Sequence, residues 1–243
     1  MSAAPLYEVF SSVQGEATRV GERHLFVRLA GCDLDCVFCD TPASRRTPDH
    51  ARVFFPSGVH AEPNPIDAAR LDELVTRLDV EAGPHHAMSL TGGEPLLFVD
   101  YLKPLATAWR ARGWTVLLET GGHRPDDLER MLDAVDVVMA DVKLPSSAGI
   151  TVDPGTVERF LALAAQRECA VKVVASSQTT VDEITGVAGL MPRDDIPLIL
   201  QPVAGSAFGP PPGDHMLALQ RAAMRLHART RVIPQAHKAL HVR

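Results

Sequence analysis

The sequence predicts an α/β fold: a partial, open TIM-like barrel of parallel strands joined by crossover helices. Short β-branched apolar runs alternate with longer amphipathic segments along most of the chain, which is typical of parallel strands with crossover helices. Seven expected strands are one fewer than a complete barrel requires. A doubly wound sheet is the alternative that this alternation also allows.

The expected strands are short and rich in β-branched residues. The runs VLLE at 116–119 and VKVVA at 171–175 are apolar almost throughout, as expected for strands that are buried on both faces. The seven expected strands are residues 24–30, 87–90, 114–119, 136–140, 170–175, 198–201 and 231–234.

The expected helices lie between these strands. Leu71, Leu74, Val75 and Leu78 recur at helical spacing, and Asp67 is suited to cap that helix at its N-terminus. The six expected helices are residues 67–80, 100–112, 125–135, 154–166, 181–190 and 214–228. The stretch at about 41–66 has five prolines before residue 66 and weak periodicity, so we expect a loop insertion there.

Length and composition limit the class of protein. With 243 residues the chain is one large domain or two small ones, and we expect a single domain over 1–243. A hydrophobic content of 46% is that of a globular chain and not of a disordered one. The net charge of −6 argues against broad binding to nucleic acid. No apolar run approaches the roughly 20 residues of a membrane helix, and no secretory signal is apparent, so we expect no membrane partner and a cytoplasmic location.

Three of the four cysteines form a C-x3-C-x2-C cluster just after the first of these strands: Cys32, Cys36 and Cys39. In a reducing compartment such a cluster favours metal binding or catalysis over a disulfide. Three thiolates on a 4Fe–4S cluster, which usually takes four cysteines, would leave one iron open to an exogenous ligand. A structural zinc site is the alternative, but it needs a fourth ligand that the nearby sequence does not supply at the usual spacing.

The segment TGGEP at 91–95 ends the next expected strand. Its two glycines allow the backbone to approach a ligand closely, and the Glu94 carboxylate could hold an ammonium group. By itself the segment could be an ordinary strand-to-helix turn. Together with the cysteine cluster, it resembles the radical S-adenosylmethionine (SAM) enzymes, in which the methionine moiety of SAM binds the open iron.

Further segments indicate one particular family within this superfamily. SSVQGEA at 11–17, FCDT at 38–41, ETGG at 119–122, DVKLPSS at 141–147, LQPV at 200–203 and QAHKALHVR at 235–243 are similar to the 7-carboxy-7-deazaguanine synthase family. Four segments depart from the family pattern: Ala17 replaces the last glycine of QGEG, Gly121 replaces the polar residue of ETSG or ETNG, Asp141-Val142-Lys143 stands for Ser-Pro-Lys, and QAHK stands for QTHK.

The resemblance implies a lyase of queuosine and 7-deazapurine biosynthesis. Such enzymes convert 6-carboxy-5,6,7,8-tetrahydropterin to 7-carboxy-7-deazaguanine, with ring contraction and loss of ammonia. A 4Fe–4S cluster, SAM and Mg²⁺ are the implied cofactors, flavodoxin or ferredoxin the implied electron donor, and a homodimer the implied assembly. Two alternatives stay open: an activase of glycyl radical enzymes from the same superfamily, and a zinc-stabilised binding module without catalysis.

The resemblance also implies roles for individual residues, with the chemistry carried out by cluster and SAM and not by a protein acid or base. Cys32, Cys36 and Cys39 would hold the cluster, and Thr41 would bind Mg²⁺, a hard ion that takes oxygen ligands. The implied substrate-binding residues are Val13, Gln14, Gly15, Glu16, Arg28, Thr91, His237 and Arg243. The implied SAM-binding residues are Gly93, Glu94, Glu119, Asp141, Val142, Lys143, Ser176, Gln201, Pro202 and Val203.

Arg28 can also be judged without the family. It lies within the apolar strand LFVRLAG, where an arginine is costly unless it is paired. Its planar guanidinium matches a carboxylate, so we expect it to bind the 6-carboxylate of the substrate; a salt bridge at the barrel edge is the alternative. Polar residues such as Thr91, Glu119, Asp141 and Gln201 also fall at strand ends, which converge on one mouth in a parallel barrel.

Overall fold

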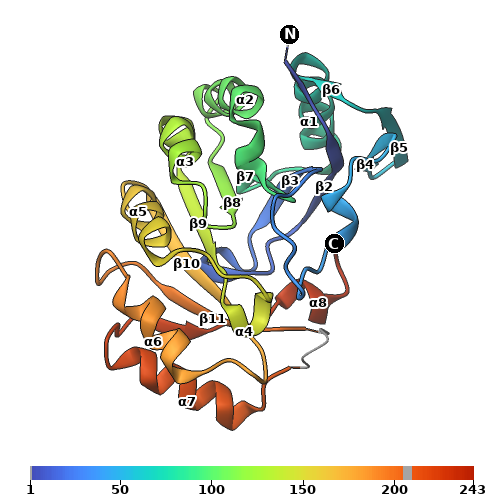
Figure 1. The fold of residues 1–243 in the computed structure, drawn as a ribbon. Coiled ribbons are helices and arrows are strands. Elements are labelled where there is room, and N and C mark those ends of the chain that lie inside the picture. Colours follow the sequence, from blue (N-terminus) through green and yellow to red (C-terminus); the bar gives the residue numbers. More distant parts are fainter. Residues whose placement is uncertain (1, 205–209) are drawn as a thin grey trace.

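The computed structural model describes residues 2–204 and 210–243 and forms an open barrel. Its main sheet has ten strands in the order β12-β11-β10-β9-β8-β7-β3-β2-β4-β5. From β3 to β12 the strands run parallel, and helices cover the outer face of the curved sheet (Figure 1). Because the helices connect these strands on one side only, the sheet is a partial barrel and the doubly wound alternative is wrong.

All seven expected strands are present and form the parallel part of the sheet. Their ends differ from the expected ones by at most two residues. The observed bounds are β3 (Arg23–Leu29), β7 (Ala87–Gly92), β8 (Val116–Thr120), β9 (Val137–Val142), β10 (Glu168–Ala175), β11 (Leu198–Pro202) and β12 (Thr230–Val232).

The six expected helices are also present. Asp67 caps the first of them, as predicted, by accepting a hydrogen bond from the Arg70 amide at 2.9 Å. Two short helices were not expected, α4 (Pro145–Ala148) and α8 (Ala236–Leu240). The long helices are α1 (Ala68–Ala82), α2 (Val99–Ala111), α3 (Pro125–Met131), α5 (Pro154–Ala164), α6 (Val181–Gly189) and α7 (Gly213–Met224), and short 3-10 turns are η1 (Ala17–Arg19), η2 (Pro42–Arg45), η3 (Pro95–Phe98) and η4 (Leu132–Ala134).

The sheet extends beyond the predicted strands at one edge. β2 (Leu6–Val13) pairs antiparallel with β3, and β4 (His50–Phe55) and β5 (Gly58–Pro63) form a hairpin beside it. β1 (Ala3–Ala4) and β6 (Ile66–Asp67) form a separate short pair. The prediction of a loop at about 41–66 is therefore wrong for most of that segment, because its prolines fall outside or at the ends of the strands and leave the ladder intact.

The alternation of side chains along the parallel strands separates the core from the site. Leu118, Val138 and Val171 belong to the large core beneath the helices, whereas Leu117 and Met139 fill the inner face. Further along the same strands, the inner positions become polar. These inner positions near the carboxyl ends are Arg28, Thr91, Glu119, Asp141, Lys172 and Gln201.

Within the described ranges, no helix is long and apolar enough to cross a membrane.

Candidate active site

A cavity of about 200 Å³ lies at the carboxyl ends of the parallel strands. Parallel barrels form their active sites at this end. The structure brings most of the predicted site residues together there. Those that line the cavity are Val13, Gln14, Gly15, Glu16, Arg28, Cys32, Cys36, Cys39, Thr41, Thr91, Gly93, Glu94, Glu119, Asp141, Lys143, Gln201, Val203, His237 and Arg243.

Three predicted residues do not line the cavity. Val142 and Pro202 follow inward-facing Asp141 and Gln201 by one position, and strand alternation turns the buried Val142 into the core under the helices. Ser176 is fully buried, and its hydroxyl accepts a hydrogen bond from the Gln178 amide at 3.2 Å. The predicted segments therefore place their strand ends at the cavity, but not every residue of each segment lines it.

The cysteine cluster lies on the loop that follows β3. Cys36 is buried, and Cys32 and Cys39 are half-buried. Burial raises the pKa of the Cys32 and Cys36 thiols, so metal binding there would release protons. The Leu34 amide donates a hydrogen bond to Cys32 Sγ at 3.4 Å, and the Val37 amide donates to the carbonyl oxygen of Ala148 at 2.9 Å. The loop is thus attached to α4 and keeps its thiols toward the cavity.

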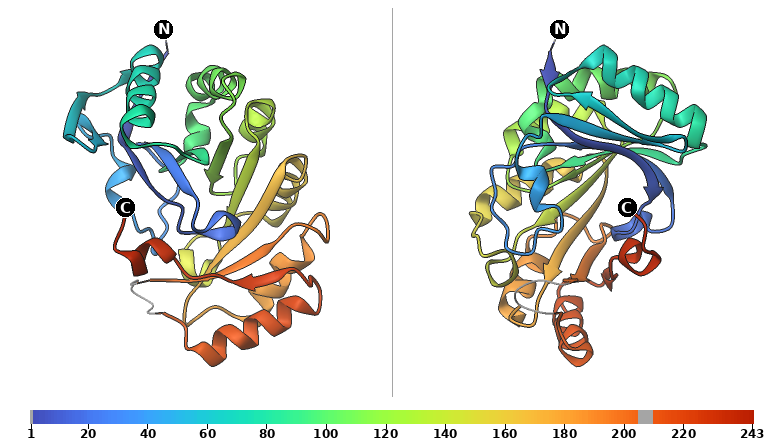
Figure 2. Two further views of the ribbon diagram at one scale, coloured as in Figure 1. Left: turned by 180° about the vertical axis from the view of Figure 1, so that it is seen from behind. Right: turned by 90° about the vertical axis from the view of Figure 1, so that its right-hand side faces the viewer.

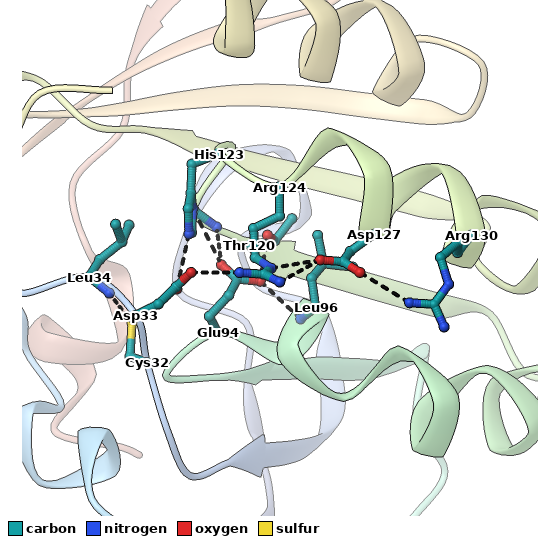
Figure 3. A network of polar contacts seen from close by, with 11 residues as sticks. Cys32, Asp33, Leu34, Glu94, Leu96, Thr120, His123, Arg124, Asp127 and Arg130 are labelled. Carbon is teal, nitrogen blue, oxygen red and sulfur yellow. Dashed lines mark hydrogen bonds and ion pairs between the residues drawn. The ribbon is translucent and has the colours of Figure 1, made fainter. Parts of the chain in front are cut away.

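Glu94 organises the loops around the cysteine cluster (Figure 3). It is 1% exposed, and its carboxylate accepts hydrogen bonds from the Leu96 amide at 3.0 Å, the Thr120 hydroxyl at 2.7 Å and the Gly121 amide at 2.8 Å. Burial raises the pKa of this carboxyl. A carboxylate has about four acceptor positions, so one remains for a ligand while the other bonds join the loops after β7 and β8.

Asp33, next to Cys32, ties the cysteine loop to the loop after β8. Its carboxylate accepts a hydrogen bond from Arg124 Nη1 at 2.7 Å and lies 3.0 Å from His123 Nε2 (Figure 3). Arg124 also contacts Asp127 at 2.6 Å. The cluster loop is therefore held on two sides before any metal binds.

Lys172 is a site residue that the sequence analysis missed. It lies in the middle of β10, with its ammonium group bonded to Glu16 and 3.0 Å from Asp141 Oδ2. Burial would lower the pKa of Lys172, but the two carboxylates raise it well above its ordinary value. Lys172 lies within the apolar run VKVVA, as Arg28 lies within LFVRLAG. A charged residue inside an apolar strand could therefore have indicated Lys172 as it indicated Arg28.

Arg28 belongs to a cluster of opposite charges around buried Glu8. Arg28 Nε lies 3.2 Å from Glu8 Oε1, while Arg52 and Arg243 reach Glu8 Oε2 at 3.3 and 2.8 Å. Three guanidinium groups thus share one carboxylate, which leaves an excess of positive charge. Arg28 and Arg243 line the cavity, so this excess is available to an anionic ligand.

The red C-terminal segment lies beside the blue N-terminal part of the chain (Figure 2), and His237 and Arg243 line the cavity together with the QGE segment at 14–16. The Ala236 amide donates a hydrogen bond to the Gly15 carbonyl at 2.8 Å, and a Cβ atom on Gly15 would lie only 2.1 Å from His237 Nδ1. Gly15 is therefore required for the close approach of His237. Ala17, where the family usually has glycine, has a φ of +51°, a backbone conformation that favours glycine.

Glu119, predicted as a SAM contact, is hydrogen-bonded to two residues expected for substrate. Its carboxylate accepts hydrogen bonds from Gln14 Nε2 at 2.6 Å and from the Thr91 hydroxyl at 3.1 Å. Burial raises the pKa of this carboxyl. Glu119 therefore orients two neighbouring polar side chains of the cavity.

Glu16→Gln is expected to change how stability depends on pH. Burial alone would raise the pKa of Glu16, but Lys172 and Gln235 outweigh it and lower the pKa from 4.5 to about 2. Because the folded-state pKa is the lower one, the stabilisation is present above about pH 4.5 and is lost as the pH falls toward 2. In urea unfolding from pH 7 to 3, the free-energy difference between wild type and Glu16→Gln should shrink at acid pH. A difference that stays constant over this range would contradict the assignment.

Comparison with known proteins agrees with this geometry. The family model of the radical SAM superfamily matches residues 27–190, so the chain belongs to that superfamily. It is 38% identical to the 7-carboxy-7-deazaguanine synthase of Geobacter sulfurreducens over 97% of this chain and 96% of the relative. It is also 38% identical to the synthase of Methanopyrus kandleri, over 96% of this chain and 92% of that relative. The chain therefore belongs to the 7-carboxy-7-deazaguanine synthase family, as the sequence motifs predicted.

Solved structures support the fold. QueE from Escherichia coli superposes with a TM-score of 0.60 at 20% identity, covering 97% of this chain and 95% of that one. A radical SAM methyltransferase from Sphaerobacter thermophilus superposes with a TM-score of 0.59 at 14% identity, covering 95% of this chain and 77% of that one. Both have the open barrel in common with this chain.

Membership of the superfamily implies a 4Fe–4S cluster and SAM, and the cavity residues fit both. Three cysteines point to a cluster with one open iron. Among the described side chains, Asp141 Oδ1 and Gln201 Oε1 are buried acceptors without a hydrogen-bond partner. Unpaired buried acceptors are costly, and SAM carries an ammonium group, an adenine amino group and ribose hydroxyls that could satisfy them.

Proposed function

We propose that this chain converts 6-carboxy-5,6,7,8-tetrahydropterin to 7-carboxy-7-deazaguanine, with ring contraction and loss of ammonia. One observation carries the proposal beyond family membership. A single cavity is lined both by the three-cysteine loop and by Arg28 and Arg243, whose positive charge Glu8 neutralises only in part. A substrate with one carboxylate and a polar ring fits such an arrangement.

The half of the cavity formed by β2, β3 and the C-terminal segment is the proposed pterin half. Arg28 and Arg243 would bind the carboxylate of the substrate, since Glu8 neutralises only part of their charge. Glu16 would accept from the guanidine-like edge of the pterin, because its low pKa keeps it an acceptor at neutral pH. Glu119 would orient Gln14 and Thr91 along the same ring.

The other half is proposed to hold the cluster and SAM. Cys32, Cys36 and Cys39 would bind three irons, with the open iron taking the methionine moiety of SAM. When bound, the cluster supplies the electron that cleaves SAM and so provides the radical that removes a substrate hydrogen. Gly93 keeps the backbone close to this position, and Asp141 and Gln201 would accept hydrogen bonds from SAM.

Thr41 is the proposed protein ligand of Mg²⁺. It lies in the cavity just after Cys39, and Asp40 beside it brings a carboxylate oxygen within 4.8 Å of ligand atoms of Glu16 and His237. The hydroxyl of Thr41 and the neighbouring carboxylate oxygens suit a hard ion that also takes water and a substrate carboxylate.

Anaerobic turnover tests the proposal directly. Reconstituted protein should bind about four irons and, with SAM, a reductant and the carboxytetrahydropterin, release ammonia and a compound with the absorbance of a deazaguanine. An intact cluster that cleaves SAM without forming this product would refute the substrate and leave the superfamily chemistry standing.

The alternatives predict other outcomes of that experiment. A glycyl radical activase would produce a glycyl radical signal on a protein partner instead of the deazaguanine. A zinc-stabilised binding module would retain one zinc and show no brown absorbance. The QGE segment lining the cavity favours the small-molecule enzyme over both.

The proposal extends to the surroundings of the enzyme. We propose flavodoxin or ferredoxin as the electron donor, a homodimer as the assembly, and one catalytic domain over residues 1–243. A cysteine group that holds a metal cluster, and not disulfides, is typical of a reducing compartment, which supports a cytoplasmic location.

A further inference from the structure

Lys172 lies where the two proposed halves of the cavity meet. Its ammonium group bonds Glu16, which follows β2, and lies 3.0 Å from Asp141 Oδ2 at the end of β9. The register of the sheet places Lys172 directly beside Asp141, so this contact is set by the backbone pairing of β10 with β9. Glu16 reaches the same ammonium from a segment that is distant in the sequence.

Each of the two carboxylates has a further partner besides Lys172. Glu16 also accepts a hydrogen bond from Gln235 Nε2 at 2.6 Å, and Asp141 Oδ2 also lies 3.0 Å from Lys143 Nζ. Lys172 is the cation that touches both among the described residues. The Lys172 side chain is 16% exposed, so water cannot easily take the place of a carboxylate that moves away from its ammonium group.

We propose that Lys172 is a positioning residue that couples the two halves of the cavity, so that binding of the pterin and binding of SAM favour each other. The inference rests on the proposed function, because it takes Glu16 as the pterin contact and Asp141 as a SAM contact.

The coupling follows from a shared cation. A pterin that bonds Glu16 fixes that carboxylate, and the fixed carboxylate holds the Lys172 ammonium in place. Asp141 is then oriented before SAM arrives, and the cost of ordering it has already been met by the first ligand. Linkage requires that SAM improves pterin binding by the same factor.

The test measures binding and not turnover. Anaerobically reconstituted holoenzyme is titrated calorimetrically with SAM, alone and with saturating 6-carboxypterin, whose aromatic C6 carries no hydrogen to abstract. In the wild type the Kd of SAM should fall at least about fivefold when 6-carboxypterin is present, the lower end of typical coupling. The coupling ratio is the Kd of SAM without 6-carboxypterin divided by the Kd with it. In Lys172→Met this ratio should fall to about one, and Lys172→Arg, which can still reach both carboxylates, should restore it in part.

Lys143→Met is the matched control. Lys143 contacts Asp141 and the face of the Phe38 ring, and within the described part of the chain it forms no ion pair with Glu16. Removing it should weaken SAM binding and leave the ratio as in the wild type. A role of Lys172 in general electrostatics or stability would not separate these two lysines.

Glu16→Gln keeps the test decisive if Lys172→Met does not fold, because it weakens the same link while Lys172 stays in place; its ratio should also approach one. A wild-type ratio of one, or the wild-type ratio in Lys172→Met or Glu16→Gln, would overturn the inference. If the enzyme makes the deazaguanine and shows no coupling, the inference alone fails. If 6-carboxypterin and the substrate both fail to bind, the proposed function fails as well.

Discussion

Gly93→Ala is expected to disrupt the cysteine loop and abolish most cluster binding. A Cβ atom at position 93 would lie 2.0 Å from the carbonyl oxygen of Gly31 and 3.0 Å from Cys32 Cβ. Neither neighbour is a flexible side-chain end, so the backbone after β3 would have to move. That movement would also break the hydrogen bond of 2.9 Å from the Glu94 amide to Gly31.

The size of the effect follows from the kind of clash. Overpacking a rigid site costs about 1–3 kcal/mol and more where backbone must shift. We therefore expect the free energy of unfolding in urea to fall by at least about 1–3 kcal/mol, and reconstituted iron and sulfide to fall to a small fraction of the wild-type content.

Gly186→Ala is the control for Gly93→Ala. Gly186 lies on the exposed side of α6, where an added Cβ atom would meet no described atom within 4 Å apart from its chain neighbours and the backbone of its own helix. Alanine is favoured over glycine in a helix by about 1 kcal/mol, so this variant should be slightly more stable and bind full iron. Normal iron content in Gly93→Ala would show that the loop after β7 does not fix the cysteine loop.

The parallel part of the fold was predictable because its strands are buried on both faces. Runs such as VLLE and VKVVA favour buried strands because they are short and rich in valine, and the first helix between strands has a clear period and a cap at Asp67. β2 and β4 were not predicted, because these strands, each with one antiparallel neighbour, mix polar and apolar residues. In β4, Ala51, Val53 and Phe55 are buried in alternation, a signal that the surrounding prolines obscured.

The site was predictable where a motif ends a strand, and less so within a strand. Thr91, Asp141 and Gln201 lie at the cavity as predicted, since parallel strands bring their carboxyl ends together. Val142 and Pro202 belong to segments that were predicted as a whole, but they do not line the cavity, because alternate residues of a strand face opposite sides. Lys172 was missed for the opposite reason: it lies inside a strand, and only its charge in an apolar run indicated it.

Contacts between segments that are distant in the chain could not be predicted from the sequence. The partner of Arg28 is Glu8 on β2, a strand that was not predicted, so the sequence left open whether Arg28 serves a salt bridge or a substrate. In the structure, Arg28 can form the salt bridge and still be available to a substrate carboxylate. Glu8 already has Arg52 and Arg243 as partners, and Arg28 can therefore bind a second anion without leaving Glu8 unpaired.

Arg28→Ala is expected to weaken pterin binding strongly while leaving the fold intact. Truncating one partner of a buried, hydrogen-bonded charge pair costs about 2–5 kcal/mol, which is about thirtyfold to several thousandfold in Kd. Stability should change far less, because Glu8 keeps two guanidinium partners. Calorimetric titration of the reconstituted enzyme with 6-carboxypterin measures the Kd, and urea unfolding measures the stability.

Arg52→Ala is the control that separates direct binding of the pterin carboxylate by Arg28 from an effect of the net charge around Glu8. Arg52 contacts the same Glu8 at 3.3 Å, but its side chain is 44% exposed and it does not line the cavity. If the carboxylate of the pterin binds Arg28 directly, Arg52→Ala should change the Kd by severalfold at most, since an exposed ion pair contributes about 0–1 kcal/mol. Equal losses in the two variants would instead mean that the cluster acts through its net charge, and an unchanged Kd in Arg28→Ala would exclude Arg28 as the carboxylate ligand.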